Sequence, residues 1–296
     1  SYNTALGAFA LDASNTAYNT AIGYKALSLL STGSQNTAVG FAALEDCTTG
    51  NYNTAVGIEA GRNVTTGSSN TIVGRNAMDA AVTGDANTAI GVKALRLTTS
   101  GDDNTAVGYQ ALTANTTGNS NTAVGYQALD ANTTADGNTA VGYIALQDVT
   151  TGAYNIAIGY YAGKDITTAE KNVAIGDNAL RTDTTSGYNI AVGSNALYAN
   201  TGGHANVAVG HKAMQSNTTG EDNVGIGASA LYANTTSSYN TAVGNRAMPS
   251  NTGALNTAVG SLCMYSNTTG TENTAIGQAA LYALSLIHIS EPTRPY

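Results

Sequence analysis

The chain is built from one short motif that recurs along its length. In each copy an asparagine is followed by a β-branched residue, usually an alanine, an aliphatic residue and then a glycine. Seventeen copies follow one another, 17 residues apart in 14 of the 16 intervals and 16 residues apart in the other two. A repeat of fixed period decides the architecture before any local pattern is considered. The asparagines stand at positions 3, 19, 36, 53, 70, 87, 104, 121, 138, 155, 172, 189, 206, 223, 240, 256 and 273.

The period predicts an all-β rod. A unit of about 17 residues is too short for a two-helix repeat, which needs about 33 residues. It suits one coil of a parallel β-solenoid, in which two or three short strands joined by tight corners stack at about 4.8 Å per coil. We therefore expect residues 1–283 to form a β-roll of about 17 coils, roughly 80 Å long, stabilised by the stacking of neighbouring coils.

The glycine that stands four residues after each asparagine indicates a corner. Only glycine accepts a positive φ angle without steric cost, so an unbroken glycine column predicts a corner of fixed, unusual geometry. The Thr-Thr-Gly segments that precede many copies, such as residues 116–118, predict a second corner. The glycine column includes Gly23, Gly40, Gly57, Gly108, Gly125 and Gly142.

Alternation along a strand predicts which columns face the interior. The residue after the asparagine and the residue two places later are uncharged in every copy. We therefore expect these Thr and aliphatic columns to point inward and the alanine between them to point outward. An outward alanine column needs a close cover, for which the simplest candidate is a neighbouring chain. We predict a parallel homotrimer whose interface includes Ala38, Ala55, Ala106, Ala123 and Ala140.

Two further columns have structural interpretations. The residue eight places after the asparagine is mostly Leu or Met, and we expect it to fill the coil interior. The asparagines should form an amide ladder in which each side chain bonds to those above and below. The alternative is that each asparagine caps its own turn. The ladder includes Asn36, Asn53, Asn104, Asn121 and Asn138.

Composition excludes several classes of function. The formal net charge of −8 and only 11 Lys and Arg residues argue against nucleic acid as a partner, because its binding needs clustered positive charge. The sequence contains no run of about 18 apolar residues, so it predicts no membrane-spanning helix. Cys47 and Cys263 lie too many coils apart for a disulfide, so we expect Cys263 in the core and Cys47 as a free surface thiol. His204 and His211 occupy different columns and predict no metal pair.

No coil between residues 3 and 283 departs from the pattern to host a cluster of catalytic groups. We therefore expect no catalytic residues, no cofactor and no metal site, and a solenoid enzyme is the least favoured reading. Tyrosines do cluster in the column after the corner glycine. They predict a stacked aromatic ladder, with an exposed strip for glycan contact as the functional alternative. The four consecutive members are Tyr109, Tyr126, Tyr143 and Tyr160.

The pattern stops after residue 283. Residues 284–296 lack the asparagine and glycine due at positions 290 and 294, and residues 284–294 resemble a translated sequencing adapter. We interpret residues 284–296 as a non-native tail. The repeat array also begins in the middle of a repeat, so we expect the chain to be a fragment.

The motif resembles two sets of surface repeats. Asn-Thr-Ala-Val-Gly followed by x-x-Ala-Leu is similar to the head repeats of trimeric autotransporter adhesins, which form a parallel β-roll of three packed chains. Residues 109–112 and 115–118 resemble still more closely the repeats found in tail-fibre-like proteins of phages and bacteria. The resemblance implies a trimer on a cell surface or virion.

Three classes of function follow from these expectations. The leading one is a non-enzymatic rod of a phage tail-fibre-like protein or bacterial surface adhesin, extracellular, with itself and a cell-surface glycan or receptor as partners. A self-assembling extracellular filament is a related alternative. Ice binding is another, because Thr-Thr pairs such as Thr116-Thr117 recur in register. Adjacent strand residues point to opposite faces, however, so such a pair does not make a flat threonine array.

Overall fold

The computed structural model describes residues 2–14 and 16–283, so the tail expected at residues 284–296 lies outside the described residues. The expected parallel β-solenoid is confirmed: the described chain forms seventeen coils, each with one three-residue strand. The strands are β1 (Thr4–Leu6), β2 (Thr20–Ile22), β3 (Thr37–Val39), β4 (Thr54–Val56), β5 (Thr71–Val73), β6 (Thr88–Ile90), β7 (Thr105–Val107), β8 (Thr122–Val124), β9 (Thr139–Val141), β10 (Ile156–Ile158), β11 (Val173–Ile175), β12 (Ile190–Val192), β13 (Val207–Val209), β14 (Val224–Ile226), β15 (Thr241–Val243), β16 (Thr257–Val259) and β17 (Thr274–Ile276).

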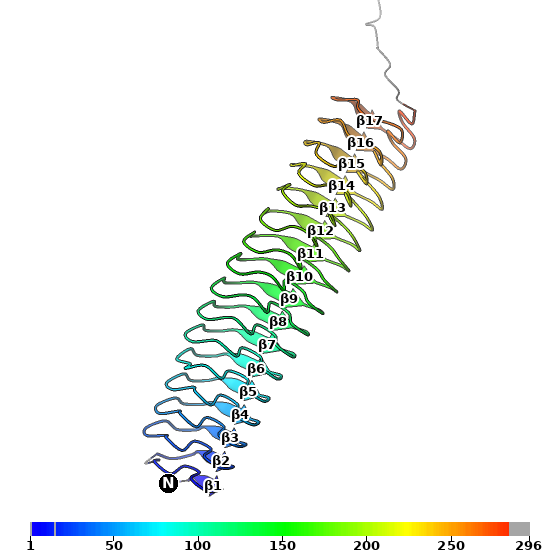
Figure 1. Cartoon of the computed structure of the whole chain (residues 1–296). Helices are drawn as coiled ribbons and strands as arrows, with labels where there is room; N and C mark the ends of the chain where they lie inside the picture. The colour runs from blue at the N-terminus through cyan, green and yellow to red at the C-terminus, as the bar shows by residue number, and fades with distance from the viewer. Residues whose placement is uncertain (1, 15, 284–296) are drawn as a thin grey trace, which may run out of the picture.

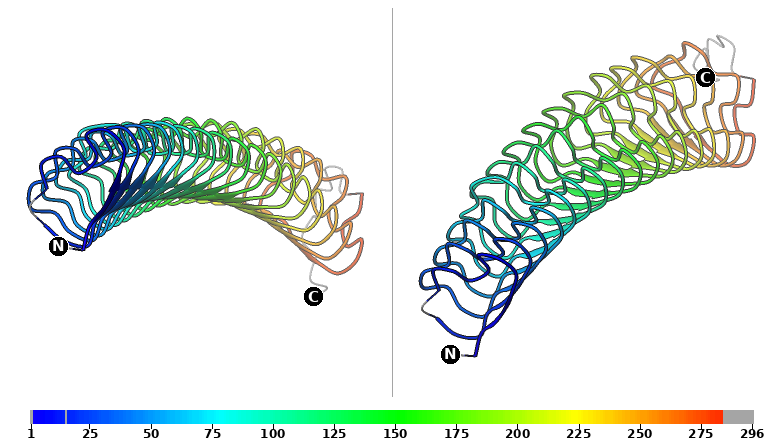
Figure 2. Two further views of the ribbon diagram at one scale, coloured as in Figure 1. Left: turned by 90° about the horizontal axis from the view of Figure 1, so that it is seen from below. Right: turned by 60° about the horizontal axis from the view of Figure 1, so that its bottom comes forward.

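Each strand pairs in parallel with the next strand along the chain. The repeats are in register, so that Thr122 of β8 pairs with Thr139 of β9 and Ala123 pairs with Ala140. The strands form one continuous sheet along one side of the stack (Figure 1). The stack is bent into an arch rather than straight (Figure 2). The asparagine positions therefore form a true column, as the period predicts.

Each coil has one strand, where we expected two or three. The other sides of the coil are turns because extended backbone is interrupted by left-handed residues, such as Gln127 with φ of 49° and Leu129 with φ of 55°. Hydrogen bonds between coils continue there nevertheless. The Leu129 N–H donates to the carbonyl oxygen of Ala145 at 3.0 Å, and the Thr133 N–H donates to that of Thr150 at 3.1 Å.

The glycine corner is confirmed. Gly125 has a φ of 142°, and its counterparts have φ values between 128° and 142°. Space is a second constraint, because a Cβ atom on Gly125 would lie 2.2 Å from the carbonyl oxygen of Gly142. The corner glycines of consecutive coils therefore stack backbone on backbone, and no side chain fits between them. The φ values of the other predicted members are 134° for Gly23, 141° for Gly40, 140° for Gly57, 139° for Gly108 and 139° for Gly142.

The predicted direction of the strand side chains is wrong. From β2 onward the alanine column points into the coil and is buried by the chain itself, whereas the Thr and aliphatic columns point outward and are half-buried or exposed. These alanines therefore cannot form an interface between chains. All five predicted interface residues have an exposed fraction of 0%: Ala38, Ala55, Ala106, Ala123 and Ala140.

The narrow coil explains the reversal. The interior already holds the Leu or Met column, so only a small side chain fits opposite it on the strand. At one place a change in one column is matched by a change in the other: Gly61 replaces the leucine, and Ile72 of the next coil replaces the alanine. A Cβ atom on Gly61 would lie 2.7 Å from Cδ1 of Ile72. Conversely, Gly225 replaces the alanine, and a Cβ atom there would lie 2.8 Å from Cγ of Met214. The predicted burial of the leucine column is confirmed.

The asparagine ladder is confirmed, although most of its bonds join a side chain to backbone. The Asn138 N–H donates to Oδ1 of Asn121 at 2.9 Å, and Nδ2 of Asn121 donates to the carbonyl oxygen of Ala135 at 2.8 Å. Direct side-chain bonds also occur, as between Nδ2 of Asn121 and Oδ1 of Asn104 at 3.1 Å. Because both partners lie in neighbouring coils, the column stabilises the stack rather than single turns. Asn36, Asn53, Asn104, Asn121 and Asn138 are all fully buried.

A second polar column, which sequence reasoning missed, lies eleven residues after the first asparagine. Nδ2 of Asn132 donates to Oδ1 of Asn115 at 2.9 Å, and Nδ2 of Asn217 donates to Oδ1 of Asn200 in the same way at 2.9 Å. Other coils hold an apolar residue at this position. In one coil the residue is Asp183, which is fully buried. Its carboxylate accepts the Ser186 N–H and the side-chain amides of Asn189 and Asn200.

Both cysteines lie inside the coils. Cys263 is buried in the column that otherwise holds alanine, as predicted. Cys47 was expected at the surface, and this is wrong: it occupies the second polar column and has an exposed fraction of 0%. Burial raises the pKa of the Cys47 thiol to about 11. Both are free cysteines.

Candidate ligand-binding surface

The four tyrosines singled out from the sequence form one continuous strip. Their rings stack along the rod, with centroid distances of 5.3, 5.1 and 5.2 Å between consecutive members and interplanar angles of 10° to 12°. The geometry follows from the coil spacing, because residues of one column repeat at about 4.8 Å. Each ring remains between 41% and 51% exposed. The strip of Tyr109, Tyr126, Tyr143 and Tyr160 is thus both a stacked ladder and an accessible aromatic surface.

The strip continues sideways at one end through residues that sequence reasoning missed. The Tyr161 ring packs edge-on against Tyr143 and Tyr160, with centroid distances of 5.7 and 4.3 Å. The guanidinium of Arg181 lies 4.8 Å from the centroid of the Tyr161 ring, and it also approaches Tyr198 at 5.9 Å. Cations within about 6 Å of an aromatic face are attracted to it. In the sequence, the adjacent tyrosines Tyr160 and Tyr161 are the feature from which a wider aromatic surface at this end could have been predicted.

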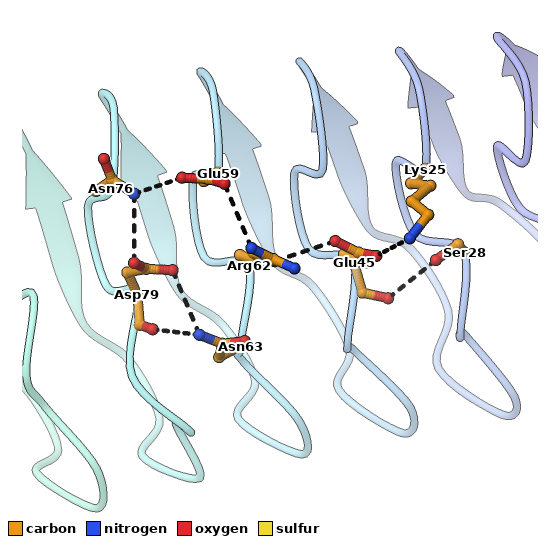
Figure 3. Close-up of polar contacts among 8 residues, drawn as sticks. All are labelled: Lys25, Ser28, Glu45, Glu59, Arg62, Asn63, Asn76 and Asp79. Carbon is orange, nitrogen blue, oxygen red and sulfur yellow. Dashed lines mark hydrogen bonds and ion pairs between the residues drawn. The ribbon is translucent and has the colours of Figure 1, made fainter.

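Several charged residues elsewhere form ion pairs across coils. Oε1 of Glu45 accepts a hydrogen bond from Nζ of Lys25 at 2.8 Å, and Oε2 of Glu45 forms an ion pair with Nε of Arg62 at 3.1 Å. These three residues come from three consecutive coils. Arg62 also contacts Glu59 at 3.3 Å. Figure 3 shows the resulting chain of contacts running across the coils. The Glu45 side chain is only 9% exposed, which strengthens these ion pairs relative to those in open solvent.

The same network ends in an amide cluster. Nδ2 of Asn76 donates to Oε2 of Glu59 at 2.7 Å and to Oδ2 of Asp79 at 3.3 Å (Figure 3). Burial raises the pKa of Asp79, and the Asn76 bond opposes that rise. These carboxylates are therefore engaged with side chains of the chain itself, so the network binds coil to coil and is a poor candidate for catalysis.

Groups that could carry other chemistry are sparse in the described ranges. Nε2 of His204 lies 3.2 Å from Oε2 of Glu221. His211 belongs to another column of the repeat. Residues 2–14 and 16–283 contain no group of three or more His, Cys, Asp or Glu side chains placed to hold a metal ion. Nor does this part of the chain contain a helix that could span a membrane.

Comparison with known proteins gave no relatives: no protein-family model and no curated protein matches the chain.

Proposed function

We propose that this chain is the repetitive rod of an extracellular attachment fibre, of the phage tail-fibre-like or bacterial surface-adhesin kind. The observation that supports it best is the uniformity of the fold: one parallel sheet runs through all seventeen described strands. A stack of this kind holds its ends apart and repeats the same surface along its length. The resemblance of the Asn-Thr-Ala-Val-Gly motif to surface repeats supports the extracellular location.

The outward face of the sheet supports a homotrimer. Its aliphatic column stays uncovered in the single chain, with Val56, Ile90 and Ile158 between 38% and 41% exposed. We propose that two further copies, side by side and parallel, cover this column. A face roughly 80 Å long and 10 Å wide offers about 800 Å² per chain, the area that each partner contributes to a stable interface. We therefore propose the outward Thr and aliphatic columns as the interface, in place of the buried alanine column.

Light scattering of the purified chain would test this assembly. The expected mass is three times that of the monomer. Val124→Glu, on the outward face of β8, should yield monomers that keep the β-type circular dichroism spectrum. Gln127→Glu is the matched control, because its column already carries Lys25 and Glu59 elsewhere, and it should remain trimeric. A monomeric wild-type chain would refute the trimer. A scattering mass that keeps increasing with protein concentration would favour the self-assembling filament.

Attachment would use the tyrosine strip. Tyr109, Tyr126, Tyr143 and Tyr160 offer rigid, amphipathic rings whose ordering costs little entropy. Replacing all four with Ser should abolish binding to the neutral glycans of an array while the oligomeric state stays unchanged. Retained binding would reduce the strip to a structural ladder.

Ice binding is the second candidate, and a different set of threonines favours it. Thr54 and Thr71 are exposed on the outward face of β4 and β5, two residues from an aliphatic neighbour. The corner threonines are less suitable, because Oγ1 of Thr116 donates to the carbonyl oxygen of Thr133 at 2.9 Å. A thermal-hysteresis measurement would distinguish the two functions. Activity that is lost on replacing the strand threonines with Lys would support ice binding, and no hysteresis would exclude it.

A further inference from the structure

Residues of the coils of β13 to β16 line an open pocket. Figure 1 shows these four strands toward the C-terminal end of the rod. The volume of the pocket is about 460 Å³. Two columns of the repeat line most of it. One column contributes Lys212, Ser229 and Arg246 from three consecutive coils. The other contributes Tyr232, Pro249 and Tyr265, also from consecutive coils.

The pocket exists because each column has a short residue between two long ones. Ser229 separates the two cations, and Pro249 separates the two tyrosines. Pro249 is bonded to the preceding coil through its carbonyl oxygen, which accepts the Ala233 N–H at 2.9 Å. Backbone bonds also hold the cationic column: the Lys212 N–H donates to Ser194, and the Arg246 N–H donates to Ala228, both at 2.9 Å. The floor of the pocket is therefore rigid.

The spacing of the two tyrosines suits a ring-shaped ligand. Tyr265 stacks on Tyr282 of the next coil at 5.1 Å with an interplanar angle of 5°, so its other face is turned toward the coil of Pro249. Two coil spacings separate Tyr232 from Tyr265, which corresponds to about 10 Å. A ring lying between two aromatic faces needs about 4.5 to 5 Å on each side. One sugar ring or planar ring matches this gap.

The pocket brings two cations together in an acidic chain. The protein has a net charge of −8, and Lys25, Arg62 and Lys164 are each paired with carboxylates. Among the ion pairs of the described residues, neither Lys212 nor Arg246 has a carboxylate partner. Two cations on the rim of one pocket favour an anionic group, and a guanidinium suits a carboxylate in particular.

We propose that this pocket binds an acidic saccharide, a sugar ring that carries a carboxylate. The ring lies between Tyr232 and Tyr265, the carboxylate pairs with Arg246 and Lys212, and Ser229 bonds a sugar hydroxyl. The proposal deepens the attachment role proposed above by naming a class of receptor. It rests on the residues of coils β13 to β16 and does not involve the tyrosine strip.

Calorimetric titration of the intact chain tests the proposal. The probes are a tetrasaccharide of alternating glucuronate and N-acetylglucosamine, a neutral tetrasaccharide of N-acetylglucosamine, and inorganic phosphate alone. We expect the acidic tetrasaccharide to bind at least tenfold more tightly than either of the others. Arg246→Gln and Tyr265→Ser should each weaken its binding by about tenfold. The matched controls are Lys93→Gln in the cationic column and Tyr126→Ser in the tyrosine strip, and both should leave binding unchanged.

Three results would overturn the proposal. The first is no binding of the acidic tetrasaccharide at millimolar concentration. The second is equal binding of the neutral tetrasaccharide or of phosphate. The third is an equal loss in Tyr126→Ser, which would assign the saccharide to the tyrosine strip. Light scattering of the same samples separates the two proposals: a trimer that binds nothing refutes only the pocket, and a monomer that binds refutes only the assembly.

Discussion

The side-chain oxygen of Asn121 accepts the backbone N–H of Asn138, one coil further along the rod, at 2.9 Å. The same bond joins Asn104 to Asn121 at 3.0 Å and Asn138 to Asn155 at 2.8 Å. Each of these asparagines therefore satisfies a buried backbone donor of the next coil. This relationship makes the column a connection between coils, and it is the basis of the first prediction.

Asn121→Ala should lower the free energy of unfolding by about 1–3 kcal/mol, because it leaves the buried Asn138 N–H without a partner and removes one of the two amide donors to the Ala135 carbonyl oxygen. Urea denaturation followed by circular dichroism measures the change. The control is Asn245→Ala, an exposed asparagine in another column, which should be neutral. Equal stability of the two variants would contradict the ladder's role.

Gly125→Ala should be among the most destabilising single substitutions, with a loss of more than about 4 kcal/mol. The added Cβ atom meets the Gly142 carbonyl oxygen at 2.2 Å, and the φ of 142° is strained for alanine. Gly202→Ala is the control, because its nearest contact would be Cγ2 of Thr219 at 3.4 Å. Thermal unfolding of both proteins should show a large shift only for Gly125→Ala.

Gly61 and Ile72 should behave as a compensating pair. Gly61→Leu forces a side chain against Ile72, and Ile72→Ala leaves a cavity, so each single variant should lose about 2–4 kcal/mol. The double variant restores the Leu and Ala of the other coils and should regain most of the stability. Simple additivity in this double-mutant cycle would mean that the two columns do not meet inside the coil.

Asp183→Asn should stabilise the chain at neutral pH. Burial raises the pKa of Asp183 above 3.8, so the folded chain holds the proton more tightly than the unfolded chain. The free energy of unfolding of the wild type therefore falls as the pH rises from 3.8 through the folded pKa. An asparagine there would bond as Asn200 does, and the gain should be about 1 kcal/mol.

The gain in Asp183→Asn should shrink at pH 3.5, where the wild-type carboxyl is protonated. Denaturant titrations at pH 7.5 and pH 3.5 would measure it, with the exposed Asp222→Asn as control. A gain that does not change with pH would show that the charge of Asp183 is not its source.

The two thiols should be unreactive in the folded chain. Cys47 and Cys263 have exposed fractions of 0%, and burial raises the pKa of both. A chromogenic disulfide reagent at pH 8 should modify neither residue until denaturant is added, and then two thiols per chain. Rapid modification of one thiol in native buffer would contradict the burial of Cys47, the residue whose location was predicted wrongly.

The period of the motif, the glycine column and the asparagine column could all be interpreted from the sequence, because each depends on a local property that recurs unchanged. Gly125 is needed for its φ angle and for close stacking, and Asn121 bonds to the same backbone groups as every other copy. The tyrosine strip follows from the same register, since one column must stack at the coil spacing.

Only the tertiary structure decided which side of the strand faces inward. Alternation divides Thr122 and Val124 from Ala123, but both sets are uncharged, so the sequence alone permits either direction. The volume inside the coil decides the direction of the strand side chains. Because the leucine column occupies the interior, only a residue as small as alanine fits opposite it. The same holds for Cys47, whose neighbours are set by the stack, and for the pocket at Pro249, which exists only because short and long residues from four coils lie side by side.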